Sequence, residues 1–201
     1  MPISSRRTTR TPNAMEIIHG IPTTPCMRPA AVTVGSFDGV HLGHQALLKA
    51  LREEADRMDG VAVVVTFDPH PRVALGRSEG LFLLTDLDEK AELLARYGVD
   101  YLVIIPFNKA FADQSGAEFA TKILVEKIGA KSLIAGYNHR FGHDRMVARE
   151  LAIEGLHVVH VEKCEVEGGH ISSSEIRRLI EAQKYGEAEK LLGHTIKLLE
   201  P

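Results

Sequence analysis

Hydrophobic residues along this chain form short continuous runs that alternate with longer stretches in which apolar residues recur every three or four positions. The continuous runs are rich in β-branched residues, which favour buried strands. They are AAVTVG from residue 30, VAVVVTF from 61, DYLVIIPF from 100, KSLIAGY from 131 and LHVVHVE from 156. Because these runs are apolar throughout, we predict a sheet that is buried on both faces.

The stretches between the runs have the apolar spacing of amphipathic helices, and several of them end at a glycine. The predicted helices cover residues 44–58, 86–98, 116–129 and 145–155, and a serine-capped helix with a second helical segment follows within 168–194. Alternating strands and helices predict an α/β fold, a Rossmann-like doubly wound parallel sheet with helices on both faces. Ligands in this architecture bind beyond the carboxyl ends of the strands.

The composition is that of a globular protein, with 44% hydrophobic and 25% charged residues and no apolar run near the length of roughly 18 residues that a membrane span needs. The net charge is −3, but residues 1–14 carry three arginines and no acid, which leaves −6 for the rest. An acidic body argues against a nucleic-acid partner. The distant Cys26 and Cys164 predict reduced thiols and a cytoplasmic location. We expect residues 1–14 to be a disordered extension and 15–201 to form one domain.

The glycine-rich segment GSFDGVHLGH, residues 35–44, joins the first run to the following helix. Its glycines allow a ligand to approach the backbone, and the helix start presents unpaired N–H groups to an anion. His41 and His44 are suited to donate hydrogen bonds to phosphate oxygens, in a pattern distinct from a Walker A loop or a dinucleotide fingerprint. Two alternatives remain: such a histidine pair also arises by chance, and His41 can serve as a helix cap.

Three further polar motifs follow later in the chain. TFDPHP, residues 66–71, offers Asp68 and His70, which are too few ligands for a protein-held metal. GYNHRFGHDR, residues 136–145, gathers basic side chains that form either a solvated face or a ligand contact. ISSSEIR, residues 171–177, places three serines before a helix, either as caps or as phosphate ligands together with an arginine.

These four motifs, in this order, resemble those of bacterial FAD synthetases, the FMN adenylyltransferase part of the bifunctional riboflavin kinase/FMN adenylyltransferases of the nucleotidyltransferase superfamily. The resemblance covers residues 15 to about 194 and implies transfer of AMP from ATP to FMN, with FAD and pyrophosphate as products and Mg²⁺ arriving with ATP. It implies that the catalytic charge stabilisers are His41, His44 and Arg177. It assigns ATP binding to Gly35, Ser36, Phe37, Gly43, Ser172, Ser173 and Ser174. It assigns FMN binding to Asp68, His70, Asn138, Arg140, Phe141 and Arg145.

The sequence departs from the family pattern at Ser36, Asn138 and His139, and the last two changes bear on FMN affinity. Four aromatic residues near predicted strand ends are either walls for the flavin ring or ordinary core residues: Phe67, Phe107, Phe111 and Tyr137. A charge-assisted contact from Arg177 to ATP predicts that its loss affects the use of ATP more than folding.

The riboflavin kinase motif of the family does not occur before Pro201. We therefore expect that the kinase domain is absent and that a separate riboflavin kinase supplies FMN. Two alternatives to FAD synthesis stay open at this point. One is adenylyl or cytidylyl transfer to another phosphorylated substrate, and the other is a flavin- or nucleotide-binding module without catalysis. Neither a membrane nor a nucleic acid is expected as a partner.

Overall fold

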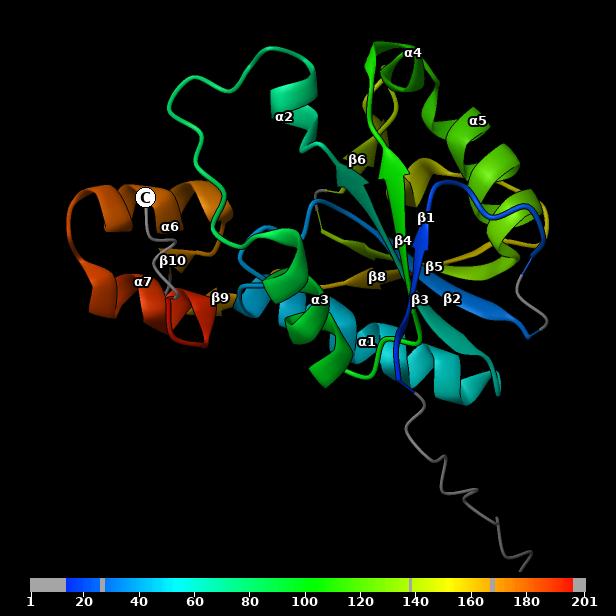
Figure 1. The fold of residues 1–201 in the computed structure, drawn as a ribbon. Coiled ribbons are helices and arrows are strands. Elements are labelled where there is room, and N and C mark those ends of the chain that lie inside the picture. Colours follow the sequence, from blue (N-terminus) through cyan, green and yellow to red (C-terminus); the bar gives the residue numbers. More distant parts are fainter. Residues whose placement is uncertain (1–13, 26–27, 138, 167–168, 197–201) are drawn as a thin grey trace, which may run out of the picture.

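The computed structural model describes residues 14–25, 28–137, 139–166 and 169–196. The predicted disordered extension lies outside these ranges, apart from Ala14. Six parallel strands form one sheet in the order β1-β4-β3-β2-β5-β8 (Figure 1). They are β1 (Glu16–His19), β2 (Ala30–Val34), β3 (Val61–Asp68), β4 (Tyr101–Pro106), β5 (Ala130–Gly136) and β8 (His157–Val161).

The chain winds outward from β2 in one direction through β3 and β4 and then returns to the other side of β2 to form β5 and β8. This confirms the predicted doubly wound α/β fold. The strand order therefore reverses between β2 and β5, which is where ligands bind in open sheets of this kind. The loops that follow these two strands carry the motifs at residues 35–44 and 136–145.

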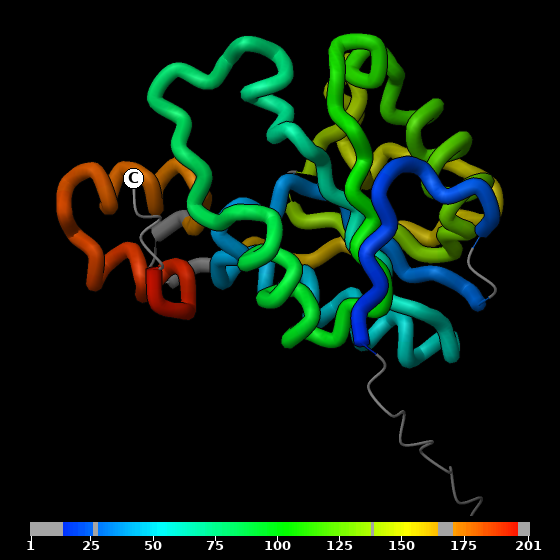
Figure 2. The backbone as a smooth tube through the Cα atoms, viewed as in Figure 1, coloured from blue at the N-terminus to red at the C-terminus, as the bar shows by residue number. Residues whose placement is uncertain are grey.

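Helices cover both faces of the sheet, as Figures 1 and 2 show. On one face α1 (Leu42–Arg57) and α3 (Leu87–Arg96) bury Leu48, Leu51 and Leu94. On the other face α5 (Gly116–Phe119) continues directly into a π-helical stretch, Ala120–Ile128, which buries Leu124. Each apolar helix stripe thus faces one side of the sheet, as the periodicity predicted.

Two sequence predictions need correction. β1 was missed because it is short, lies at the sheet edge and is partly exposed, so its sequence EIIH lacks a continuous apolar run. The predicted helix over residues 145–155 is wrong. There, β7 (Met146–Val147) pairs in antiparallel fashion with β6 (Arg140–Phe141), and only one 3₁₀ turn follows at Ala148–Glu150. The apolar residues of this segment pack against the main core without forming a helix.

The predicted C-terminal helices are present as α6 (Ser173–Glu181) and α7 (Tyr185–Leu192), which pack against each other beside the sheet (Figure 1). They have a small core of their own, formed by Ile176, Leu179, Ala188 and Leu192. A short antiparallel pair, β9 (Glu165–Val166) and β10 (Gly169–His170), precedes them. Two single-turn helices, α2 (Pro71–Ala74) and α4 (Lys109–Ala112), follow the carboxyl ends of β3 and β4.

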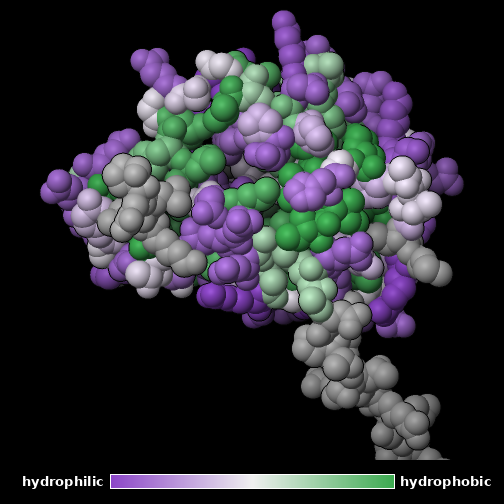
Figure 3. All heavy atoms as spheres, in the orientation of Figure 1, coloured by the Kyte–Doolittle hydropathy of each residue, from purple (hydrophilic) through white to green (hydrophobic). Residues whose placement is uncertain are grey.

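Exposed apolar side chains gather in two places, over the edge strand β1 and over the segment around α2 (Figure 3). They include Ile17 and Ile21 in the first group and Val73, Leu75, Phe82 and Leu83 in the second. Within the described residues, no helix has the length and apolar character required to cross a bilayer.

Glu54 on α1 anchors this helix to the start of β5. Its carboxylate accepts hydrogen bonds from the Arg57 guanidinium, at 2.7 and 2.8 Å, and from the Ser132 hydroxyl. The bonds from Arg57 are the main reason why the pKa of Glu54 falls from 4.5 to about 2, and the bond from Ser132 adds to this effect although burial opposes it. The folded state therefore favours the ionised carboxylate.

We expect Glu54→Gln to lower the free energy of unfolding at pH 7 by about 1–2 kcal/mol, because it removes the charge from these hydrogen bonds. The folded pKa lies below the unfolded one, so this stabilisation is complete above about pH 5 and is lost as the pH falls towards 2. Urea unfolding of both proteins at pH 7 and pH 3 measures the difference. Glu53→Gln, at the exposed neighbouring position, is the control, and a wild-type advantage that does not shrink at pH 3 contradicts the assignment.

Candidate active site

A large cavity opens at the carboxyl ends of β2, β3 and β4. It has a volume of about 1440 Å³ and is bounded by the starts of α1 and α6, by residues 70–77 and by the β6–β7 hairpin. Ligand pockets commonly have roughly 300–1,000 Å³. The cavity therefore has room for two ligands of nucleotide size side by side.

Most of the predicted site residues line this one cavity: Gly35, Ser36, Phe37, His41, His44, His70, Arg140, Phe141, Arg145, Ser172, Ser173, Ser174 and Arg177. Gly43 and Asp68 are not among the lining residues. Asp68 is exposed at the end of β3. A Cβ atom at Gly43 would come within 3.2 Å of the His41 ring, so this glycine makes room for the imidazole. Asn138 lies outside the described residues.

His41 is the N-cap of α1, which begins at Leu42, two residues before the predicted start. Its Nδ1 accepts a hydrogen bond from the backbone N–H of His44 at 3.3 Å. A neutral imidazole that accepts at Nδ1 carries its proton at Nε2. The capping role that the sequence left open is thus present, and the same contact defines His41 as a donor through Nε2.

His44 stacks on His41 with a ring separation of 3.7 Å and an interplanar angle of 16°. Burial lowers the pKa of His44 well below its ordinary value, and the charges of His41 and Lys90 act in the same direction. Its Nδ1 is buried and has no hydrogen-bond partner within the described part of the chain. His44 is therefore neutral at pH 7, and a bound polyanion would reverse part of this shift.

Asp38 is a site residue that the sequence analysis missed. Its Oδ1 accepts hydrogen bonds from the backbone N–H groups of Leu84, at 2.8 Å, and Thr85, at 3.3 Å. Its other carboxylate oxygen forms a buried ion pair with Arg177 on α6, and its backbone carbonyl accepts from the Ser173 hydroxyl at 2.9 Å. Asp38 is the only acid in the GSFDGVHLGH motif. A single acid in this motif could have indicated from the sequence that the loop needs a cationic partner.

Arg177 is held at two points. Its Nε donates to the Phe82 carbonyl at 2.6 Å, and a terminal nitrogen contacts Asp38. Burial lowers its pKa, and the Asp38 charge opposes this shift. A guanidinium has five N–H donors, so these two contacts leave donors that can serve an anion in the cavity. Arg177 is therefore both a structural ion-pair partner and a cation in the cavity wall.

The loop after β2 is strained. Phe37 and Val40 have positive φ angles of 47° and 37°, a conformation that bulky residues rarely adopt and that costs about 1–3 kcal/mol each. Gly39, at φ +80°, lies so close to residue 84 that a Cβ would be 2.8 Å from Leu84 Cδ1. Burial of Phe37 and Val40 and the contacts of Asp38 keep the loop in this shape.

The serines at the start of α6 play different roles. Ser172 is the N-cap, and its Oγ accepts from the Glu175 N–H at 3.2 Å, a bond that does not use its hydroxyl proton. The Ser173 hydroxyl donates its hydrogen bond to the Asp38 carbonyl, and Ser174 is exposed. The capping alternative is thus realised at Ser172, while the hydroxyl protons of Ser172 and Ser174 can point to a ligand.

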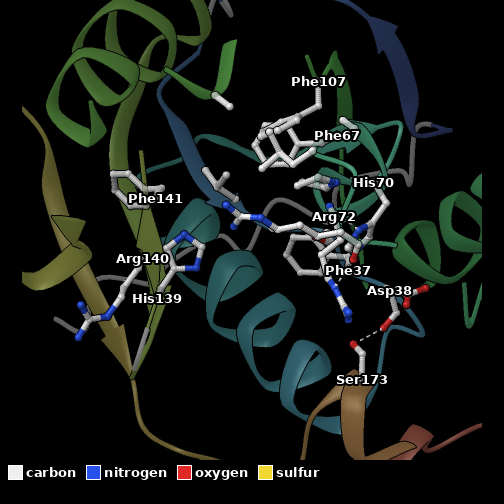
Figure 4. A pocket seen from close by; sticks show the side chains of 18 of the residues that line it. Phe37, Asp38, Phe67, His70, Arg72, Phe107, His139, Arg140, Phe141 and Ser173 are labelled. Carbon is white, nitrogen blue, oxygen red and sulfur yellow. Dashed lines mark hydrogen bonds between the residues drawn. The ribbon is translucent and has the colours of Figure 1, made fainter. Parts of the chain in front are cut away.

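A wall of aromatic rings forms another part of the cavity (Figure 4). Phe67 lies 5.2 Å from Phe107 and 5.8 Å from Phe111 between ring centroids, and Phe119 lies 6.0 Å from Phe141. The predicted Phe67, Phe107 and Phe111 are therefore wall residues. Tyr137 is 54% exposed and does not line the cavity.

The cavity wall is cationic although the protein is acidic overall. Its lining includes Arg72, Arg77, Lys109, Arg140, Arg145 and Arg177, against two acids, Asp38 and Asp113. Sequence analysis missed Arg77 and Lys109 because they lie in segments without a recognisable motif, and it missed Arg72 because this residue lies just beyond the TFDPHP motif. His70 caps α2 through its Nδ1, and burial lowers its pKa. Among the described residues, no group of three or more His, Cys, Asp or Glu is arranged to hold a metal ion.

A doubly wound sheet with a cationic cavity and helix starts at the carboxyl ends of its strands is an arrangement typical of α/β proteins that bind phosphorylated ligands. Comparison with known sequences gives the family. The sequence model of FAD synthetase matches residues 23–175. The chain belongs to the FAD synthetase family, which confirms the resemblance drawn from the four motifs.

Curated relatives are bifunctional riboflavin kinase/FMN adenylyltransferases. The protein from Escherichia coli strain K12 is 32% identical over 182 residues, which is 88% of this chain and 58% of that protein. The protein from Listeria monocytogenes is 34% identical over 168 residues, which is 81% of this chain and 53% of that protein. The chain thus spans between half and two thirds of the length of these relatives.

A solved structure has the same fold. It is titled as the crystal structure of a macrolide-efflux protein from Streptococcus pneumoniae, with a TM-score of 0.82 and 31% sequence identity. The match covers 90% of this chain and 62% of that chain.

We expect Asp38→Asn to lower the free energy of unfolding by about 3–5 kcal/mol, because it leaves the buried Arg177 guanidinium without a counter-charge. Arg177→Gln should be similarly destabilising, which revises the expectation that its loss would largely spare folding. Urea unfolding gives both values. Arg178→Gln breaks an exposed pair with Glu175 on the same helix and should leave the midpoint nearly unchanged. If all three variants unfold at the wild-type midpoint, the ion pair does not hold α6 in place.

Proposed function

We propose that this chain transfers the adenylyl group of ATP to FMN, which yields FAD and pyrophosphate. The observation that carries the proposal is that the start of α1, the start of α6 and an aromatic wall all line one cavity. Family membership supports it, since both substrates of this reaction carry phosphates and a flat aromatic ring system, of which the flavin of FMN is the larger. The size of the cavity agrees with two bound substrates.

In this reaction an oxygen of the FMN phosphate attacks the α-phosphorus of ATP, and the bond from that phosphorus to the bridging oxygen breaks as pyrophosphate leaves. The attacking oxygen is already ionised at neutral pH, so no proton needs to be removed. Catalysis then requires alignment of the two phosphates and stabilisation of the charge on the phosphoryl oxygens. Histidine, serine and arginine side chains donate hydrogen bonds to phosphate oxygens, so they suit this charge stabilisation better than the acids of the chain.

In this proposal His41 and His44, at the start of α1, donate hydrogen bonds to the phosphates of ATP. His41 offers Nε2–H, because its Nδ1 is occupied by the backbone N–H of His44. The start of α6 faces the same cavity with the hydroxyl proton of Ser172 and the remaining donors of Arg177. Two helix starts therefore direct partial positive charge at one polyphosphate. Gly35, Ser36 and Phe37 form the adjoining floor of the cavity.

The aromatic wall suits the flavin ring, and the basic residues Arg140 and Arg145 beside it suit the FMN phosphate. Asp68 and Gly43 are not assigned a ligand contact. Mg²⁺ would enter with ATP, held mainly by phosphate oxygens and water, which agrees with the small number of acids in the lining. The FMN that is consumed must come from an ATP-dependent phosphorylation of riboflavin, a reaction that the names of the curated relatives include.

Purified protein supplied with ATP, Mg²⁺ and FMN should form FAD and an equal amount of pyrophosphate. Chromatography of the flavins and an enzymatic pyrophosphate assay follow both products. CTP in place of ATP, and phosphopantetheine or nicotinamide mononucleotide in place of FMN, are the comparison substrates. Faster turnover of one of these would indicate a different nucleotidyl transfer, and binding of ATP and FMN without product would indicate a binding module.

His44→Gln should reduce the turnover number by roughly 10²–10³, the effect typical of losing one donor to developing charge. The thermal midpoint should change little, since glutamine fills a similar volume. His160→Gln, at an exposed position on β8 outside the cavity lining, serves as the matched control and should keep wild-type turnover. A parallel loss of midpoint and activity in His44→Gln would indicate a structural role for this histidine.

A further inference from the structure

Residues 38–40, in the loop between β2 and α1, are held by their backbone carbonyl groups. Each of these three carbonyls lies within hydrogen-bond distance of one side chain, in chain order Ser173 at 2.9 Å, His194 at 2.8 Å and Gln45 at 3.0 Å. The contact of His194 is made by Nε2, while its Nδ1 lies 3.0 Å from the carbonyl of Thr195. A carbonyl oxygen only accepts, so the contact with the loop requires a proton on Nε2. The phosphate chemistry described above does not use this histidine.

The chain after α7 lies against the start of α1, which places His194 beside the loop. Gly193 ends α7 with a φ of 74°, and a Cβ atom at this position would come within 2.6 Å of Leu42 Cδ2. The Gln45 side-chain amide also donates to the Leu192 carbonyl at 2.7 Å. The backbone that carries His194 is therefore attached to α1 on its own account, independently of the imidazole.

The contact with His194 fixes one peptide group in the strained part of the loop. The carbonyl of Gly39 and the N–H of Val40 belong to the same planar peptide and point in opposite directions. The N–H donates to the Phe37 carbonyl at 3.3 Å, and the carbonyl meets His194. Val40 has a φ of 37°, which a β-branched residue rarely adopts. Loss of the His194 contact would let this peptide turn towards a relaxed orientation.

The orientation of this peptide matters for the imidazoles of the cavity. The residue after Val40 is His41, the N-cap of α1, whose ring accepts from the His44 N–H and stacks on the His44 ring. A turn of the preceding peptide would move both rings relative to a bound polyphosphate. Group transfer depends on alignment, and a displacement of about 1 Å can reduce the rate by about 10²-fold. His194 is not among the residues that line the cavity, so its effect must pass through the loop.

We propose that His194 is a positioning residue, which holds the Gly39 carbonyl and thereby places His41 and His44 for contact with the ATP phosphates. This inference rests on the proposed function and extends it to the segment after α7. That segment contributes to adenylyl transfer although its side chains lie outside the cavity lining.

His194→Phe tests the contact, since it keeps an aromatic ring and removes the donor. We expect kcat/KM for ATP to fall about tenfold. The Kd for FMN and the thermal midpoint should stay close to wild type, because the aromatic wall and the bond from Gln45 to Leu192 remain. His194→Gln keeps an N–H donor at a similar distance along the side chain and should recover most of the loss. His160→Phe, the same replacement at an exposed histidine, is the control.

A double variant distinguishes a positioning role from an independent effect on activity. In a His44→Gln background, His194→Phe should lower kcat/KM for ATP by less than about threefold, because one of the groups that it positions is already absent. Independent effects would multiply, so a full tenfold loss in this background contradicts the inference.

A lower thermal midpoint of His194→Phe with unchanged kcat/KM for ATP would overturn the inference and give His194 a role in folding alone. Equal losses in His194→Phe and His194→Gln would overturn it as well, because the proton on the ring would then not matter. His194→Leu permits the same comparison if the phenylalanine variant does not fold. Absence of FAD formation in the wild type would instead remove the proposed function, and the inference with it.

Discussion

The buried ion pair between Asp38 and Arg177 is the contact on which the site depends. It joins the strained loop after β2 to α6, two segments that are distant in the sequence and that belong to different cores. The same carboxylate receives two backbone N–H groups from the segment before α3. One acid therefore positions three elements around the opening of the cavity. It holds the start of α6 beside the loop that leads into α1, together with the hydrogen bonds from Ser173 to the Asp38 carbonyl and from Gln45 to the Leu192 carbonyl.

The interactions that fold the site also prepare its polar groups for a ligand. The cap on α1 places the His41 proton at Nε2, and the cap on α6 leaves the Ser172 hydroxyl proton unused in that bond. Gly39 and Gly43 permit the close packing that these contacts require. Such preorganisation costs stability in the empty protein, seen here as positive φ angles in bulky residues and as the His44 Nδ1 that has no hydrogen-bond partner among the described residues. A polyanion bound between the helix starts would recover part of that cost.

The fold could be predicted from sequence to the extent that its elements have strong apolar patterns. The strands β2, β3, β4 and β5 were predicted because burial on both faces leaves continuous apolar runs, and the long helices because of their apolar spacing. Of the two edge strands, β8 retains an apolar run although it is partly exposed, whereas β1 has none. Residues 145–155 have helical spacing, but pairing of Met146 and Val147 with the preceding strand decides their structure. The apolar spacing alone does not reveal this hairpin pairing with residues 140–141.

The residues of the candidate site were likewise predicted only in part from the sequence. The histidine pair, the serines and Arg177 were predicted because their motifs resemble those of a known family and follow strand ends, which the sheet brings together. The importance of Asp38 was not predicted, because its partner lies 139 residues away along the chain. Arg72 and Arg77 reach the cavity from a segment whose path depends on tertiary packing. Gly43 was assigned to ATP, and the structure adds that its lack of a side chain makes room for the His41 ring.

The separate core of α6 and α7 has a consequence for how this family can diversify. Substitutions among Ile176, Leu179, Ala188 and Leu192 alter the packing of the helical pair without reaching the interior beneath the sheet. Natural variation in that pair is therefore constrained mainly by its attachment to the loop after β2. Exchange of the whole pair between homologues should be tolerated as long as the arginine that meets the aspartate is kept.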